Sequence, residues 1–318
     1  MSAPVRGVRL MPVCDTSRMS SPYLVRRIGV GAAALGVLAG VTALIVAIAS
    51  VPDSSSHGNA DAAAVASGTP EVHALSATTG TLVGGEAITI TGASLDAVTD
   101  VTFGGVSAAD IVIADSGTLT AVVPAAVDFQ PATVAIEVVA DEAPVAAAAD
   151  LDYTYETSTA VDRQMEYLLT HWNDYNVDEY GDLNSVGGDC ANFASQSLLL
   201  RGWEMTDEWF NYDAGSDWSG AWGYVPAFEN WLTANPELGA TQLSFDERDQ
   251  VKVGDLVVFD WNDNDYLDHI QVVSSVETVD GEIVIKMVGH NLDTNYRDLD
   301  DTITVDHPDA TGHFWSIP

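Results

Sequence analysis

The chain begins with three segments that differ in their pattern of hydrophobic and polar residues. Residues 1–27 are polar, residues 28–49 form a run of 22 residues without a charge, and residues 51–70 contain few large apolar side chains. An uncharged run of this length can span a bilayer as a helix, and it also resembles a long secretory signal with a small-residue cleavage site at residues 47–49. We therefore expect residues 1–50 to act as a signal peptide or a membrane anchor, followed by a flexible linker at 51–70.

The basic residues near the start of the chain set its orientation. Five of the 11 basic residues are arginines that precede the uncharged run. Basic residues stay on the cytoplasmic side, so the chain beyond residue 50 is predicted to lie outside the cell, either secreted or anchored at the surface. Contact with a membrane is expected only through the N-terminal segment, if that segment is not cleaved.

In residues 71–156 the pattern of apolar and polar residues changes to a period of two. Apolar and polar residues alternate along five short segments, which are separated by Gly, Pro, Asn or Asp. This pattern is typical of the strands of a β-sandwich. We expect an all-β, immunoglobulin-like domain at 71–156 and find no catalytic constellation in it. The five predicted strands are residues 87–92, 100–105, 110–113, 119–124 and 134–139.

Residues 157–318 mix helical and strand patterns. A helix is predicted after Ser158 or Thr159, because apolar residues then recur at helical spacing and form a core-facing stripe. A second helix is expected to begin at Cys190 and to end at Gly202. Strands follow at residues 253–259, 269–276 and 283–288, the last two joined by an Asp-Gly turn. The segment is therefore predicted to be one α+β domain.

The charge balance excludes one class of partner. The whole chain carries a formal charge of −36, and beyond residue 50 there are six basic and 46 acidic residues, which leaves −40. Such a surface repels phosphates, so we exclude nucleic acid as a partner. It suits a secreted protein kept soluble by its charge, or one acting at a cationic or ion-rich surface.

The stretch with the most chemical character is residues 187–196, GGDCANFASQ. Asp189 is suited to cap a helix, and the N–H groups of the first turn favour the thiolate form of Cys190, which is the nucleophile. The alternative is a buried structural cysteine. The only other cysteine, Cys14, precedes the export segment, so a disulfide within the exported part is excluded. This favours a catalytic thiol.

Two histidines lie on the predicted hairpin. If Asp280 and Gly281 form its turn, His269 lies opposite Leu292, and His290 is its diagonal neighbour on the same face. One histidine could then act as base and the other could orient it. Asn291 would face the other way, although a bulge or a slip of one residue would reverse the choice.

No metal or cofactor is expected. Residues 260–265 match the first three ligand positions of an EF-hand, but position 6 is Asp265 instead of Gly and position 12 is Gln271 instead of Glu. The alternatives are a calcium site and a solvated acidic loop, and the second is preferred. The cysteine and histidines show no zinc-ligand spacing.

Two stretches resemble known families. Residues 71–156 resemble the IPT/TIG immunoglobulin-like family, which implies a spacer or interaction module; the matching pieces are TTG at 78–80, ITITG at 88–92, VTFGG at 101–105, VVP at 122–124 and YTY at 153–155. Residues 157–318 resemble the papain-like NlpC and CHAP cell-wall hydrolases and, more narrowly, a bacterial "putative amidase" family; the matching pieces are DCANFASQ at 189–196, GDLVVF at 254–259, HIQV at 269–272 and GHN at 289–291.

The second resemblance implies roles for individual residues. Cys190 is similar to the family nucleophile and His269 to its general base. His290 fits the third, orienting position, with Asn291 as the alternative. Asp189, Asn192 and Gln196 are candidates for lining the site, and a packing or capping role is open for Asn192 and Gln196.

The function expected from these features is an exported cysteine amidase or peptidase. It would cut an amide bond in cell-wall peptides through a thioester on Cys190. Whether the wall is the cell's own or a competitor's, and which bond is cut, are open. The alternative is a catalytically silent binding or adhesion module at the cell surface.

Overall fold

We describe residues 68–318 from a computed structural model. The predicted export signal or anchor at residues 1–50, and all but the last residues of the linker at 51–70, lie outside the described residues. Within residues 68–318, no helix is both long enough and apolar enough to cross a membrane.

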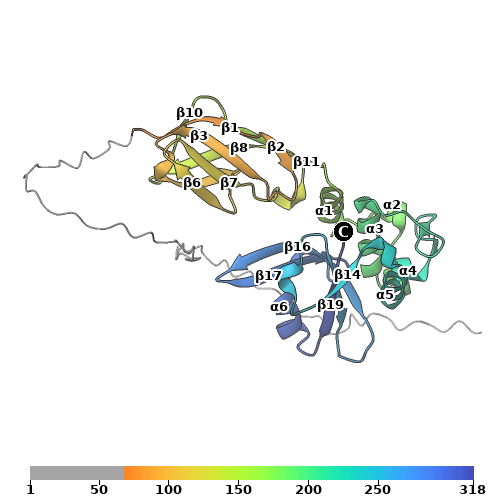
Figure 1. Ribbon diagram of the computed structural model, residues 1–318. Helices are drawn as coiled ribbons and strands as arrows, with labels where there is room; N and C mark the ends of the chain where they lie inside the picture. The colour runs from red at the N-terminus through yellow and green to blue at the C-terminus, as the bar shows by residue number, and fades with distance from the viewer. Residues whose placement is uncertain (1–67) are drawn as a thin grey trace, which may run out of the picture. The chain divides into compact units, whose positions relative to one another are not determined.

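The region after residue 70 is a sandwich of two sheets (Figure 1), as the alternating pattern predicted. One sheet has the order β10-β1-β3-β7-β6, and the other β2-β11-β8-β4-β5, with β9 beside β8. In β3, Ile88 and Ile90 are buried and Thr89 between them is not. The strands are β1 Glu71–Leu75, β2 Thr79–Thr81, β3 Ala87–Ala93, β4 Val98–Phe103, β5 Val106–Ser107, β6 Ile111–Asp115, β7 Thr118–Val122, β8 Ala132–Ala140, β9 Ala143–Pro144, β10 Ala146–Ala147 and β11 Asp152–Glu156.

The C-terminal region combines helices with a six-stranded antiparallel sheet of order β14-β19-β15-β16-β17-β18. Its strands are β14 Thr241–Ser244, β15 Leu256–Asp260, β16 His269–Val279, β17 Glu282–Gly289, β18 Thr294–Asp298 and β19 Thr311–Ser316. The helices are α1 Ala160–His171, α2 Val177–Tyr180, α3 Cys190–Arg201, α4 Gly220–Gly223, α5 Val225–Ala234 and α6 Leu299–Asp301; β12 Asn211–Tyr212 and β13 Asp217–Trp218 form a separate small ribbon.

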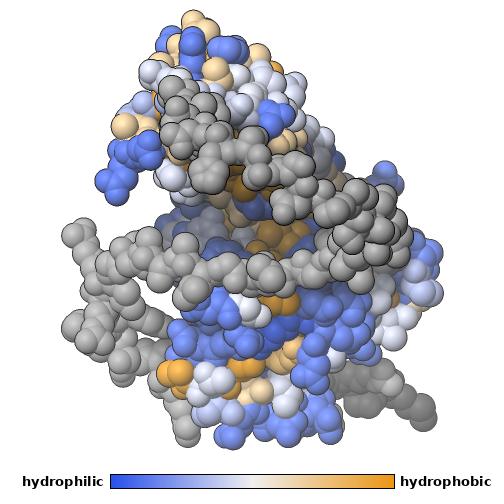
Figure 2. Space-filling model, turned by 60° about the vertical axis from the view of Figure 1, so that its left-hand side comes forward, coloured by the Kyte–Doolittle hydropathy of each residue, from blue (hydrophilic) through white to orange (hydrophobic). Residues whose placement is uncertain are grey.

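This sheet is buried on both faces, with a different cover on each. On one face, Val258, Val272 and Val288 belong to the same apolar cluster as residues of α3. On the other face, Phe259 and Met287 join a second cluster that includes Leu299 of α6. Strands buried on both sides read as continuous apolar runs, which explains the sequence LVVF in β15. Figure 2 shows a face of the molecule on which hydrophilic residues predominate, in keeping with the charge.

Helix ends follow the expected local chemistry in two cases. Thr159 caps α1 by accepting the N–H of Asp162, and the Asp162 carboxylate accepts the N–H of Thr159 in return, so the two residues form a capping box. Gly202 ends α3 with a φ of 118°, a conformation that favours glycine. Both boundaries were predicted from the sequence.

The hairpin of β16 and β17 differs from the predicted one by a single residue. Near the turn the pairing is as expected, with Val279 opposite Glu282 and Ser275 opposite Lys286. A bulge between Val273 and Ser275 then shifts the register, so that Val273 pairs with Met287. Because a shift of one residue reverses the faces, the expectation that His269 and His290 share a face is wrong.

A buried polar cluster joins α1 and α3 to the entry of β15. Arg201 donates to Gln164 Oε1 at 2.5 Å, and Gln164 Nε2 donates to the carbonyl oxygen of Gly254 at 3.1 Å. Gly254 has a φ of +89°, and a Cβ at this position would lie 2.6 Å from both Arg201 Nη1 and Gln164 Oε1. The glycine is therefore required twice, once by its backbone conformation and once by its neighbours.

Substitution Gly254→Ala should destabilise the C-terminal region by more than Gly281→Ala. Gly281 has a nearly equal φ of +87° and nothing within 4 Å of an added Cβ. The second variant thus measures the conformational penalty alone, about 1–2 kcal/mol. Gly254→Ala should cost roughly a further 1–3 kcal/mol because it displaces a buried hydrogen-bonded pair. Urea unfolding followed by Trp fluorescence reports this region alone, because all eight Trp follow residue 157. Equal costs would contradict the close packing at Gly254.

Candidate active site

Cys190 is the first residue of α3, and only 4% of it is exposed. It belongs to the apolar cluster on the α3 face of the sheet. The first turn of a helix presents N–H groups without partners inside the helix, and these N–H groups favour an anion. The position therefore has the electrostatics that a nucleophilic thiolate needs.

The cap of α3 differs from the expected one. Asp189 lies at the N-cap, but its side chain makes no capping hydrogen bond. Instead, Asn291 Oδ1 accepts the backbone N–H of Asp189 at 2.5 Å and that of Cys190 at 2.8 Å. A residue distant in sequence thus caps the helix, and the Asp189 carboxylate is left for another partner.

That partner is His290. Asp189 Oδ2 lies 2.5 Å from His290 Nδ1, while Asp189 Oδ1 accepts the N–H of Leu183 at 2.9 Å and Nδ2 of Asn192 at 2.8 Å. Asp189 is 0% exposed and His290 is 1% exposed. Burial of a carboxylate is costly unless it is paired and hydrogen-bonded, and here both conditions are met.

The His290 ring is held on all sides. It stacks between Tyr175 and Phe193, with ring centroids 3.6 and 3.7 Å away and interplanar angles of 4° and 5°. Its Nε2 lies 2.9 Å from the carbonyl oxygen of His171. Because a carboxylate and a carbonyl oxygen both accept, this arrangement suits an imidazolium, which donates from both nitrogens. The two flanking rings suit such a cation.

His269 lies on the other face of the sheet. Its ring neighbours are Phe259 and Trp261, with centroids 6.3 and 5.3 Å away, and both belong to the apolar cluster opposite α3. It is 2% exposed, and Nε2 has no hydrogen-bond partner among the described residues. Burial, with help from the charges of Arg297 and His307, lowers the pKa of His269 to about 3. These ring neighbours lie on the face opposite the cluster that contains Cys190, which argues against the expectation that His269 serves that thiol.

The other two candidate site residues belong to packing networks. Asn192 is buried; its Oδ1 accepts from Trp222 Nε1 at 2.7 Å and from Asn211 at 3.1 Å. Gln196 is also buried and accepts the Tyr167 hydroxyl at 2.6 Å. Of the predicted set, the structure brings together Cys190, Asp189, His290 and Asn291.

No role was predicted for the two rings that hold His290 or for the carbonyl of His171. No short-range pattern could indicate them, because α1, the loop that follows it and α3 each supply one.

In the acidic loop, Asp260 is turned inward, where its carboxylate accepts the N–H groups of Asn262, Asn264 and Tyr266 at 2.9–3.2 Å. That carboxylate therefore serves the fold of its own loop.

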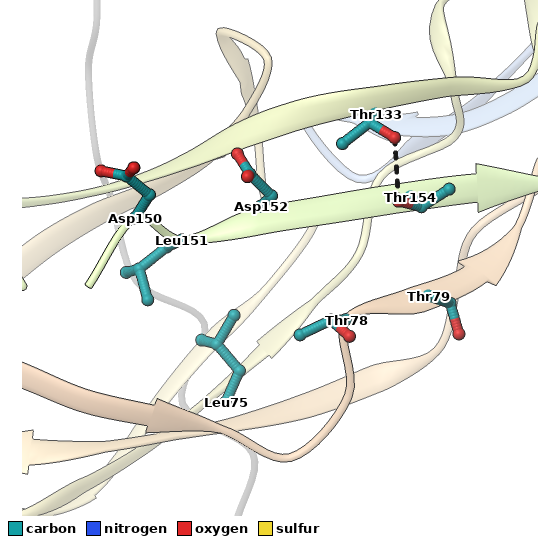
Figure 3. Close-up of a pocket in the computed structure, with 8 residues that line it drawn as sticks. All are labelled: Leu75, Thr78, Thr79, Thr133, Asp150, Leu151, Asp152 and Thr154. Atoms are coloured by element: carbon teal, nitrogen blue, oxygen red, sulfur yellow. Dashed lines mark hydrogen bonds between the residues drawn. The ribbon is translucent and has the colours of Figure 1, made fainter. Parts of the chain in front are cut away.

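A separate pocket of about 490 Å³ lies on the sandwich (Figure 3). Within it, Thr133 and Thr154 share a hydrogen bond of 2.9 Å. Its lining contains no cysteine, histidine or lysine. The lining residues are Leu75, Thr78, Thr79, Thr133, Asp150, Leu151, Asp152 and Thr154.

The chain has a β-rich region followed by a mixed α/β domain. This second domain places a cysteine at a helix start, next in sequence to the aspartate of a buried Asp–His pair. Comparison with family models agrees with both parts. Residues 70–155 match the "IPT/TIG domain" model, and residues 154–315 match the "Putative amidase domain" model. The second match spans half of the chain, and the protein belongs to that amidase family. No curated protein matches the chain.

Solved structures give only distant likenesses. An auxiliary nutrient binding protein from Bacteroides ovatus is 24% identical, with 28% of this chain and 22% of that one covered and a TM-score of 0.20. A glucan-locus protein of the same species, SGBP-B in complex with a mixed-linkage heptasaccharide, is 10% identical over 78% and 52%, with a TM-score of 0.24. SGBP-B from a xyloglucan locus of Bacteroides uniformis is 10% identical over 78% and 67%, with a TM-score of 0.22. Likenesses at these scores carry no argument about function.

The buried His269 should make the C-terminal region sensitive to acid. An unfolded His takes up a proton near pH 6.5, whereas the folded His269 does so only near pH 3. Between these values the unfolded state binds the extra proton, so the contribution of His269 is fully present above pH 6.5 and falls by about 1.4 kcal/mol per pH unit below it. Urea unfolding at pH 7, 6, 5 and 4 should show this slope. His269→Phe, which does not titrate, should flatten it; an unchanged slope would contradict the assignment.

Proposed function

We propose that the C-terminal domain is a papain-like, cysteine-dependent amidase. In this proposal Cys190 is the nucleophile, His290 is the general acid and base, and Asp189 orients His290. The proposal rests mainly on the buried Asp189–His290 contact of 2.5 Å, since Asp189 directly precedes Cys190 at the start of α3. It links a helix-start thiol, a charged imidazole and a carboxylate. These are the parts of a nucleophile–base–orienter triad. The family match supports the reaction class.

The positive charge on His290 and the start of α3 both favour the Cys190 thiolate, which attacks the carbonyl carbon of the amide. The resulting oxyanion accepts backbone N–H groups at the helix start. Nδ1 of His290 is held by Asp189, so the proton for the leaving amine comes from Nε2, which must release the carbonyl oxygen of His171. Expulsion of the amine leaves a thioester on Cys190 and a neutral ring.

Water completes the cycle. The neutral ring takes a proton from a water molecule at Nε2 while the water oxygen attacks the thioester carbonyl. The intermediate collapses, expels the Cys190 thiolate and releases a carboxylic acid. The ring is again charged, and atoms and protons balance over the two halves of the reaction.

The substrate class that fits an exported enzyme of this kind is an amide in cell-wall peptides. The proposal supposes that residues 1–50 direct export and that the IPT/TIG region acts as a spacer or interaction module. The formal charge of −40 beyond residue 50 supports work at a surface that carries cations or amino groups.

A binding module is the second candidate, and the closed geometry of the site favours it. Cys190 is 4% exposed, and the N–H donor expected to hold the oxyanion already serves Asn291. A protein that only recognises a wall or a partner protein would have no need to open this arrangement. The outcome of the variants below decides between the two.

The proposal predicts the effect of three substitutions in the full chain on the release of wall fragments, measured by mass spectrometry. Cys190→Ala should abolish release, and His290→Gln should lower the rate by roughly 10²- to 10⁴-fold, the usual range for loss of an acid–base group. His269→Gln should lower it by far less, since His269 lies on the opposite face of the sheet. Release of wall fragments that survives Cys190→Ala would overturn the mechanism. If His269→Gln lowers the rate more than His290→Gln does, the acid–base role belongs to His269.

A further inference from the structure

The side chain of Asn291 lies where the mechanism needs the carbonyl oxygen of a substrate. Its Oδ1 accepts two backbone N–H groups at the start of α3, at 2.5 Å from Asp189 N and 2.8 Å from Cys190 N. An oxyanion formed by attack of Cys190 would need donors at this distance and in this place. Asn291 is itself a primary carboxamide, so an amide already occupies the site.

The nitrogen end of this carboxamide is recognised as well. Asn291 Nδ2 donates a hydrogen bond to Asn184 Oδ1. Asn184 precedes Cys190 in the loop before α3 and is exposed, whereas Asn291 is half-buried and Cys190 is buried. The bound carboxamide therefore lies between the helix start and the solvent, on the side from which a substrate would enter.

The backbone of Asn291 is also specialised for this placement. It has a φ of +66°, a left-handed conformation that Asn tolerates better than most residues. Asn291 directly follows His290. The bulge that sets the face of His290 therefore also sets the backbone position of Asn291. The carboxamide is held by backbone geometry at one end and by three hydrogen bonds at the other.

The geometry points to Asn291 as an internal occupant of the substrate amide site, and to substrates whose scissile amide carries an N–H that Asn184 accepts. This inference rests on the proposed function and names its substrate class: primary carboxamides and secondary amides such as ordinary peptide bonds. Tertiary amides, such as the bond before a proline, have no N–H to offer and should be rejected. Substrate must displace the Asn291 side chain to enter.

The test uses two small electrophiles in place of a substrate, 2-iodoacetamide and its N,N-dimethyl derivative. Asn291→Gly removes the side chain and tolerates the positive φ. Alkylation of Cys190 by iodoacetamide should become roughly tenfold faster, because the two N–H groups lose a competing acceptor. The dimethyl reagent should gain clearly less. The rate is read by mass spectrometry on the peptide that carries Cys190, which separates it from Cys14.

Three further variants make the result specific. Asn291→Asp keeps an acceptor oxygen and adds a negative charge that disfavours the thiolate, so its rate should not exceed that of the wild type. Asp280→Gly removes another side chain at positive φ, in the exposed hairpin turn, and should change nothing. Asn184→Ala, added to Asn291→Gly, should reduce the preference for iodoacetamide over the dimethyl reagent by roughly fivefold. Circular dichroism checks that each variant is folded.

The outcomes separate this inference from the proposed function. If Asn291→Gly is alkylated no faster than Asp280→Gly, the side chain is not an occupant of the site and the inference fails, whatever the hydrolytic activity. If the preference between the two reagents survives loss of Asn184, the N–H recognition fails. If the alkylation pattern holds but no variant releases wall fragments, the amide site stands and the proposed hydrolysis fails.

Discussion

The structure of the C-terminal domain depends on the buried contact between Asp189 and His290. These groups are 101 positions apart, and neither is more than 1% exposed. Each would be costly to bury alone, and loss of one partner from such a pair costs about 3–5 kcal/mol. The contact fixes the start of α3 against the end of β17, and the remaining polar atoms of both residues have partners. The position of the thiol follows from this one contact.

The sequence was informative wherever the cause of a structure is local. Gly202 ends a helix, Asp280 and Gly281 form a turn, and LVVF lies in a strand, because neighbouring residues largely decide these features. No run of neighbouring residues in β16 marks the bulge, which is seen only in the pairing with β17. The role of Asp189 was missed for a related reason: its carboxylate suits a cap, but Asn291 fills that position from far along the chain.

The two faces of the sheet divide the histidines by chemistry. On the α3 face, His290 has acceptors at both nitrogens and rings on both sides. On the other face, His269 lies among apolar rings near Arg297, and its pKa falls to about 3. The same side chain thus has acceptors at both ring nitrogens on one side of a β-sheet and mainly apolar neighbours on the other. Identity in a motif does not decide which of these surroundings a histidine has.

The bulge between Val273 and Ser275 also has an evolutionary consequence. Surface hairpins usually tolerate insertions and deletions well. Here, the loss of one residue from β16 at the bulge would keep the turn, yet it would put His269 and His290 on the same face of the sheet. The number of residues in this strand therefore matters as well as their identity. A gap placed in this strand when relatives are aligned would therefore misplace the faces of the two histidines, even where every motif is intact.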